Sequence, residues 1–287
     1  MTMTMGACIV FSCVNISWRT EYLFRLDKQI QHSDFLPGRT AHPTTRDNDP
    51  SQGPLRNQRS KYQIPRIVHQ TYKSTDLPPN FKSWRDECIT QNPGWEFKIW
   101  TDDDNLQLVE EHYPQLLELY LGYDIKIKRI DMVRFLYLHK FGGVYMDMDM
   151  TCLKPFGSVL DQYYGKVIFA NQYSSNGNLV EYATAFMASS PGLDLFDDIF
   201  HELPLHKDLP VLVATGSKFL KRFILRKAIN EGKWVGFPME LIYAQEWTDT
   251  NLCTSIEKCR MQFPEAITVS FWTHTWRDGS DKVLEWQ

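Results

Sequence analysis

Residues 125–150 read I-K-I-K-R-I-D-M-V-R-F-L-Y-L-H-K-F-G-G-V-Y-M-D-M-D-M. Apolar side chains recur at helical spacing in the first sixteen positions, which predicts a helix over residues 125–140. Gly142-Gly143 then supplies a helix C-cap and a turn. The six residues from Val144 to Asp149 alternate as a strand does, so we expect a helix that turns tightly into a strand.

The flanking sequence predicts more strands. Residues 64–71, 95–100, 166–170 and 266–269 have strand character. Thr101 and Asp104 form a capping box that opens a helix directly after the second of these segments. Alternating strands and helices predict an α/β fold with a mostly parallel sheet.

The sharpest chemical signal is Asp147-Met148-Asp149. Side chains two apart in an extended strand share a face, so both carboxylates are expected to point one way and the methionines the other. Two neighbouring carboxylates repel each other, and a shared divalent cation relieves that repulsion. Oxygen ligands suit Mn²⁺ or Mg²⁺ held together with substrate phosphates. Asp131 and Arg134 share one face of the preceding helix, either as a surface ion pair or as ligand contacts.

These motifs resemble glycosyltransferase family 32, the DXD-motif group that includes fungal α-1,6-mannosyltransferases and mannosyl-inositolphosphoceramide synthases. The block from Asp131-Met132-Val133-Arg134 through Gly142-Gly143 and Tyr145 to Asp147-Met148-Asp149 is similar to that family's D-x-x-R…G-G-x-Y-x-D-x-D pattern. The segment 64–71, I-P-R-I-V-H-Q-T, resembles its opening strand, and 274–276, H-T-W, its closing element.

The resemblance implies one GT-A type, Rossmann-like domain that binds a nucleotide-sugar at the carboxyl edge of its sheet. It implies a metal-dependent, retaining hexose transfer, with GDP-mannose favoured as donor and a UDP-sugar second. The acceptor would be a glycan or inositol phosphoceramide. The implied donor-binding residues are His69, Gln70, Thr71, Asp131, Arg134 and Tyr145. The implied ligands of Mn²⁺ (or Mg²⁺) are Asp147, Asp149 and His274. It identifies no catalytic nucleophile.

Net charge and cysteine spacing argue against two classes of function. The 287 residues hold 31 Lys+Arg against 35 Asp+Glu, a net charge of −4, which argues against a nucleic-acid partner. The six cysteines include no CxxC pair, which argues against a structural zinc site. Cys253 and Cys259 enclose a short loop and could be a disulfide or two free thiols.

The first 61 residues differ from the rest. Residues 37–61 contain only two apolar side chains, Ala41 and Leu55, so we expect residues 1–61 to be a flexible segment or stem before a catalytic domain at 62–287. Residues 6–16 form an apolar run that is too short to span a bilayer and lacks preceding Lys or Arg. It is either a remnant of a membrane anchor or a loose terminus. The family implies a Golgi or other secretory-pathway lumen.

Two other functions remain as alternatives. Residues 147–151, D-M-D-M-T, also fit the D-x-D-x-T pattern of haloacid dehalogenase-type phosphatases, with Asp278 and Asp281 as the late acidic pair. A non-catalytic carbohydrate-binding protein is the other alternative. The segment 215–218, T-G-S-K, lacks the spacing of a phosphate loop and is interpreted as opening a helix over residues 218–229.

Overall fold

The computed structural model describes residues 63–172, 174–175, 178–179, 181–224, 226, 232–246 and 253–273. Its strands are β1 (Ile67–Thr71), β2 (Glu96–Trp100), β3 (Gly143–Met146), β4 (Met150–Cys152), β5 (Val167–Asn171), β6 (Ser174–Ser175), β7 (Asn178–Leu179), β8 (Tyr182–Ser189), β9 (Trp234–Phe237) and β10 (Thr268–Ser270). Its α-helices are α3 (Pro79–Gln91), α4 (Asp102–His112), α5 (Leu117–Leu121), α6 (Lys126–Phe141), α7 (Gly157–Leu160), α8 (Leu195–Glu202), α9 (Val211–Ala214), α10 (Ser217–Phe223), α11 (Met239–Ile242) and α12 (Ile256–Gln262).

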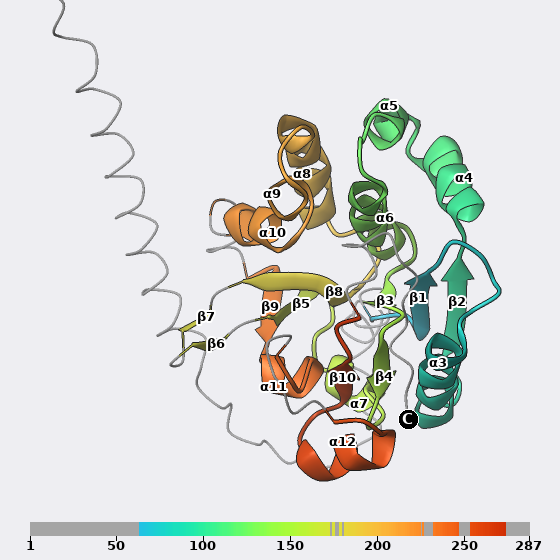
Figure 1. Ribbon diagram of the computed structural model, residues 1–287. Helices are drawn as coiled ribbons and strands as arrows, with labels where there is room; N and C mark the ends of the chain where they lie inside the picture. The colour runs from blue at the N-terminus through green and yellow to red at the C-terminus, as the bar shows by residue number, and fades with distance from the viewer. Residues whose placement is uncertain are drawn as a thin grey trace, which may run out of the picture.

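Six strands form the central sheet, in the order β2-β1-β3-β8-β5-β9 (Figure 1). Three of the five pairings are parallel, and β8 runs antiparallel to both of its neighbours. The expected α/β class with a mostly parallel sheet is therefore confirmed. The last predicted strand lies outside this sheet, because β10 pairs antiparallel with β4 in a separate ribbon.

Helices cover both faces of the sheet. Helices α4, α5, α6, α8 and α10 bury their apolar side chains in one core cluster, and α3, α7 and α11 contribute to clusters on the other face (Figure 1). Helix α6 is buried continuously from Asp131 to Leu138, and the four residues from Phe135 to Leu138 are fully inaccessible to solvent. Burial on all sides places α6 as the inner helix of its layer.

The predicted Gly142-Gly143 connection between α6 and β3 is present, and both residues adopt left-handed backbone conformations, with φ of 64° and 90°. A Cβ on Gly143 would lie 2.4 Å from the carbonyl oxygen of Ile67, and one on Gly142 would lie 2.7 Å from the Pro191 ring. Only glycine therefore allows this turn to pack so closely against β1.

The strand that follows is shorter than predicted. β3 ends at Met146, and the Met150 N–H donates to the Asp147 carbonyl at 3.3 Å, closing a turn over residues that were expected to be extended. Met146, Met148 and Met150 are buried as expected, while both acids remain partly exposed. The carboxylates therefore share one cavity because of a turn, and not because of strand alternation.

Candidate active site

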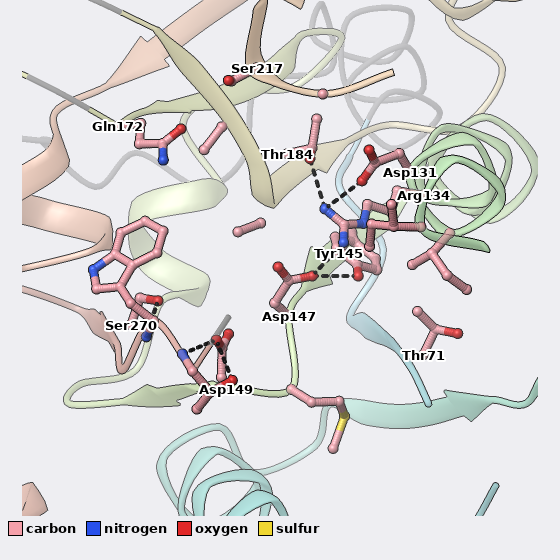
Figure 2. Close-up of a pocket in the computed structure, with 18 of the residues that line it drawn as sticks. Thr71, Asp131, Arg134, Tyr145, Asp147, Asp149, Gln172, Thr184, Ser217 and Ser270 are labelled. Atoms are coloured by element: carbon pink, nitrogen blue, oxygen red, sulfur yellow. Dashed lines mark hydrogen bonds and ion pairs between the residues drawn. The ribbon is translucent and has the colours of Figure 1, made fainter. Parts of the chain in front are cut away.

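A cavity of about 240 Å³ opens beside the carboxyl ends of β1 and β3. Figure 2 shows acidic, basic and hydroxyl side chains entering it from separate elements. Among the described residues that line it, Asp131, Asp147 and Asp149 are the acids and Arg134 is the base. When all four side chains are ionised, their summed charge is negative.

Arg134 is the centre of this site. Its Nη1 donates to Thr184 Oγ1 at 2.7 Å and lies 3.3 Å from Asp131 Oδ1, and its Nη2 lies 3.1 Å from Asp147 Oδ1. The guanidinium also lies over the Tyr145 ring, 4.8 Å from the centroid. Burial alone lowers the pKa of Arg134, but Asp147, Tyr145 and Asp131 outweigh it and raise that pKa above its ordinary value. The side chain is therefore a fixed, fully charged donor.

Asp131 is a buried carboxylate at the wall of the cavity. Thr215 Oγ1 donates to its Oδ2 at 2.8 Å, and burial raises its pKa above the ordinary value despite the opposing effect of Arg134. The alternative of a surface ion pair between Asp131 and Arg134 is wrong, since both side chains are less than 8% exposed. The pair is part of the cavity.

Asp147 and Asp149 each keep one oxygen bound by protein. Arg134 Nη2 and the Tyr145 hydroxyl both contact Asp147 Oδ1, the hydroxyl donating at 2.6 Å. The Thr273 N–H and hydroxyl both donate to Asp149 Oδ2, at 2.9 and 3.1 Å. Among the described residues, each carboxylate thus has its second oxygen left for a ligand in the cavity.

This arrangement fits a divalent cation. Burial raises the pKa of Asp147 to about 6, and the nearby charge of Asp149 adds to that rise while Arg134 opposes it. Burial also raises the pKa of Asp149. A cation between them would remove the repulsion and restore both charges. No cluster of three or more His, Cys, Asp or Glu side chains that could hold a metal occurs in the described part of the chain, so further ligands would come from elsewhere. His274, the third expected ligand, lies outside the described residues.

The three residues at the end of β1, His69, Gln70 and Thr71, differ in whether they line the cavity. Thr71 lines the cavity, and its hydroxyl donates to the Trp100 carbonyl at 2.9 Å. His69 and Gln70 are fully buried and do not line the cavity, which corrects the expectation that they contact the donor. The reason is the position along β1. The sheet and its covering helices enclose the side chains of His69 and Gln70, and only Thr71, the last residue of the strand, reaches the open edge of the sheet.

His69 instead supports the backbone behind the site. The Trp100 indole N–H donates to its Nδ1 at 3.1 Å, so its Nε2 carries the proton and donates to the Gly142 carbonyl at 2.9 Å. Burial lowers the pKa of His69 to about 4, and a charge on Lys98 adds slightly to that effect. A neutral imidazole therefore holds the turn that leads into β3.

The sequence did not reveal the threonines that complete the site. Thr184, Thr215 and Thr273 come from β8, the C-cap of α9 and the segment after β10, and each binds a charged side chain of the cavity. Thr215 stands in the T-G-S-K segment, where α10 begins at Ser217 as expected for a helix start. No local pattern marks a threonine as the partner of a distant carboxylate.

Two disulfides lie near the site. Cys253–Cys259 is bonded, which settles the alternative left open by the sequence. Cys88–Cys152 joins α3 to β4 and was not predicted, since 64 residues separate its cysteines. The described residues include no helix with both the length and the apolar character to cross a bilayer.

Comparison with known proteins identifies the region around the cavity. Residues 78–166 match the family model described as "Glycosyltransferase sugar-binding region containing DXD motif". The chain is 36% identical over 97 residues to mannosyl phosphorylinositol ceramide synthase SUR1 of Saccharomyces cerevisiae, covering 34% of this chain and 25% of that protein. It is 28% identical over 166 residues to inositol phosphoceramide mannosyltransferase 1 of Schizosaccharomyces pombe, covering 57% and 46%. The chain thus spans less than half the length of these curated relatives.

Two further matches extend the comparison. The uncharacterized glycosyltransferase L373 of Acanthamoeba polyphaga mimivirus is 29% identical over 172 residues, covering 58% of this chain and 67% of that protein. Among solved structures, the PaToxG glycosyltransferase aligns with a TM-score of 0.47 and 12% identity, covering 74% of this chain and 79% of that chain. The resemblance to DXD glycosyltransferases of family 32 is therefore confirmed for the region around the cavity, and the relatives that match it include a protein named as a mannosyltransferase and one named as a glycosyltransferase.

Proposed function

We propose that this chain is a metal-dependent, retaining mannosyltransferase that moves mannose from GDP-mannose to the headgroup of inositol phosphoceramide. The observation that carries the proposal is the cavity with three carboxylates and one guanidinium. Such a cavity repels a nucleotide diphosphate unless a cation enters with it. The names of the fungal relatives favour mannose and the lipid acceptor over a glycan.

The side chains divide the work of binding. Asp147 and Asp149 would hold Mn²⁺ or Mg²⁺ through the oxygens that Arg134, Tyr145 and Thr273 leave open. When bound, the cation would supply Lewis-acid stabilisation for the charge that develops on the departing diphosphate. Asp131 would accept hydrogen bonds from sugar hydroxyls, and Arg134 would donate to a hydroxyl or to the phosphate.

The proposed transfer needs no protein nucleophile. The sugar–phosphate bond breaks with its electron pair going to the diphosphate, and the acceptor oxygen bonds to the anomeric carbon on the same face. The acceptor proton passes to the leaving phosphate oxygen. The chain's own contribution is to fix the donor and exclude water around the reacting bond.

The dehalogenase-type phosphatase is the weaker alternative. In that reaction Asp147 would attack phosphorus through its Oδ2, since Arg134 and Tyr145 contact its Oδ1. The late acids Asp278 and Asp281 lie outside the described residues. The family match to a sugar-binding region favours transfer.

The location proposed is a secretory-pathway lumen such as the Golgi. Both disulfides support it, because such bonds persist in oxidising compartments and are rare in the cytosol.

The test is a transfer assay on the full chain with GDP-mannose and Mn²⁺, inositol phosphoceramide vesicles as acceptor, and mass spectrometry of the lipid. We expect the lipid to gain one hexose, EDTA to abolish the gain and added Mn²⁺ to restore it. Parallel reactions with UDP-sugars and with a glycan acceptor serve as controls. Full turnover in a chelated, metal-free sample would contradict metal dependence, and transfer only to the glycan would contradict the lipid acceptor.

A further inference from the structure

Large apolar side chains are exposed at few places on the described surface. Five of the eight fall in two short segments, at the junction of α5 with α6 and around the start of α9. We call these five the apolar rim: Leu121, Ile125, Leu205, Leu209 and Leu212. The rest lie on other elements, so the exposed aliphatic surface is concentrated.

The two segments adjoin in space. The buried Lys128 extends its Nζ to the carbonyl of Lys207 at 3.0 Å and to Asp124 Oδ1 at 2.8 Å. The Lys207 ammonium also lies against Gly122, because a Cβ added there would approach its Nζ to 2.6 Å. Helices α5, α6 and α9 lie on the same side of the sheet in Figure 1. A buried lysine therefore holds the two segments that carry the rim side by side.

This surface continues into the cavity. Leu212 belongs both to the rim and to the cavity wall, and Val211, Ile127 and Ile130 line the cavity next to it. An apolar path thus runs from the exposed rim to the acids and Arg134.

We propose that the apolar rim rests in the surface of a lipid bilayer, so that the headgroup of a membrane lipid enters the cavity as the acceptor. The inference depends on the proposed function for the identity of that acceptor. Exposed aliphatic side chains at helix ends and loops gain free energy by burial among acyl chains.

A bilayer suits this rim better than a second protein does. A protein that covered the rim permanently would lie over the side of the cavity that Leu212 borders, and it would obstruct the acceptor. A bilayer carries the acceptor itself. Lys126 lies within the first segment, where its ammonium pairs with Asp102, and Lys207 lies within the second, where its ammonium lies against Gly122. Asp208 is also exposed there, and Asp124 is paired with Lys128.

The first experiment measures flotation of the full chain with phosphatidylcholine vesicles in the absence of any nucleotide-sugar. The test variant is Leu205→Ser with Leu209→Ser, whose side chains are 71% and 38% exposed. The matched control is Met261→Ser with Ile89→Ser, at 75% and 38% exposure on other elements. We expect the test variant to partition about tenfold more weakly and the control to match the original chain.

The second experiment identifies which face meets the lipid, because residues 6–16 are apolar and could contribute to flotation. The photoreactive substitution Leu205→p-benzoylphenylalanine is compared with Met261→p-benzoylphenylalanine on the same vesicles. Lipid cross-linked at position 205 and not at 261 supports the proposal, and this result decides the question where residues 6–16 alone keep the test variant on the vesicles. Equal capture at both positions, no lipid at 205, or capture of a second copy of the chain there overturns it. Failure of sugar transfer with lipid capture intact would reject the proposed function alone.

Discussion

The three carboxylates of the cavity have different hydrogen-bond and ion-pair partners, and these differences predict different roles in binding. Asp147 and Asp149 lie on one turn, and among the described residues each has one oxygen without a protein partner. Asp131 lies on α6, held by Thr215 and Arg134. This separation predicts that metal binding and sugar transfer can be impaired independently.

We predict that Asp131→Asn preserves the fold and the affinity for Mn²⁺ with GDP but loses most transfer. The isosteric amide keeps an oxygen for Thr215 and removes the charge offered to the sugar. A charge-assisted hydrogen bond is worth about 1.5–3 kcal/mol, or roughly one to two decades in rate when it forms in the transition state. Asp149→Asn should instead weaken Mn²⁺-dependent GDP binding itself.

Calorimetry with Mn²⁺ and GDP, alongside the transfer assay, separates the two effects. Asp86→Asn is the control, since this exposed acid on α3 pairs only with Lys82 among the described residues. If Asp131→Asn abolished GDP binding or left transfer untouched, the donor-sugar role of α6 would be wrong.

The sequence could predict the charged residues of the site and not their partners. Asp131, Arg134, Asp147 and Asp149 fall within nineteen residues whose spacing follows from one helix, one turn and one strand. Thr184 lies 50 residues from Arg134, and Thr215 lies 84 residues from Asp131. These contacts depend on how the sheet is ordered, which no local periodicity encodes.

At the scale of elements, the connection from α6 to β3 depends on a buried histidine. His69 donates to the Gly142 carbonyl and stacks on Tyr137, with ring centroids 5.4 Å apart. Only the neutral ring can also accept from the Trp100 indole at Nδ1, so protonation would break that bond. A change of protonation on β1 therefore acts on the turn that leads to Asp147.

We predict that this histidine makes the fold sensitive to acid. Its pKa is about 4 in the folded chain and about 6.5 when unfolded, so between these values the unfolded state binds more protons. The stability it contributes is complete above pH 6.5 and is lost as the pH falls toward 4, by roughly 3 kcal/mol. Urea unfolding at several pH values measures this loss.

His69→Gln provides the comparison, because its amide can still donate to Gly142 and does not titrate. It should be less stable than the original chain near neutral pH, and its stability should fall less between pH 6.5 and 4.5. An identical pH dependence in both proteins would show that His69 is not the group responsible.

The central strand β8 shows why the hydrophobic pattern of the sequence did not predict every strand of the sheet. All eight residues of β8 are buried, so Tyr182–Ser189 lacks the alternation that identifies a strand with one wet face, and it went unpredicted. The capping box at Thr101 was confirmed, since it depends only on neighbouring residues. Local chemistry was therefore predicted better than sheet membership.

At the scale of the whole molecule, long-range links join the site to its surroundings. Cys88–Cys152 fixes α3 to β4, three residues beyond Asp149. Arg260 on α12 donates to the Leu153 carbonyl at 3.2 Å and forms an ion pair with Glu87. The segment that follows Asp149 is thus held by a disulfide to α3 and by a hydrogen bond from α12.

We predict that a chain beginning at Tyr62 folds and binds Mn²⁺ with GDP as the full chain does. Among the described residues the clusters of buried apolar side chains begin at Ile64, and residues 37–61 offer almost no apolar side chains to extend them. Circular dichroism and calorimetry on both chains provide the measurement. Aggregation of the shorter chain, with the longer one soluble and active, would contradict this boundary.

The bond between Thr273 and Asp149 spans 124 residues of sequence. A ribosome makes the chain from its amino end, so Asp149 leaves the exit tunnel long before the threonine that orients it. Most of the sheet can form during that interval, while the second acid of the motif still lacks its partner. The proposed cation site would therefore be completed late in synthesis, and a chain that ended before Thr273 would hold most of the sheet without it.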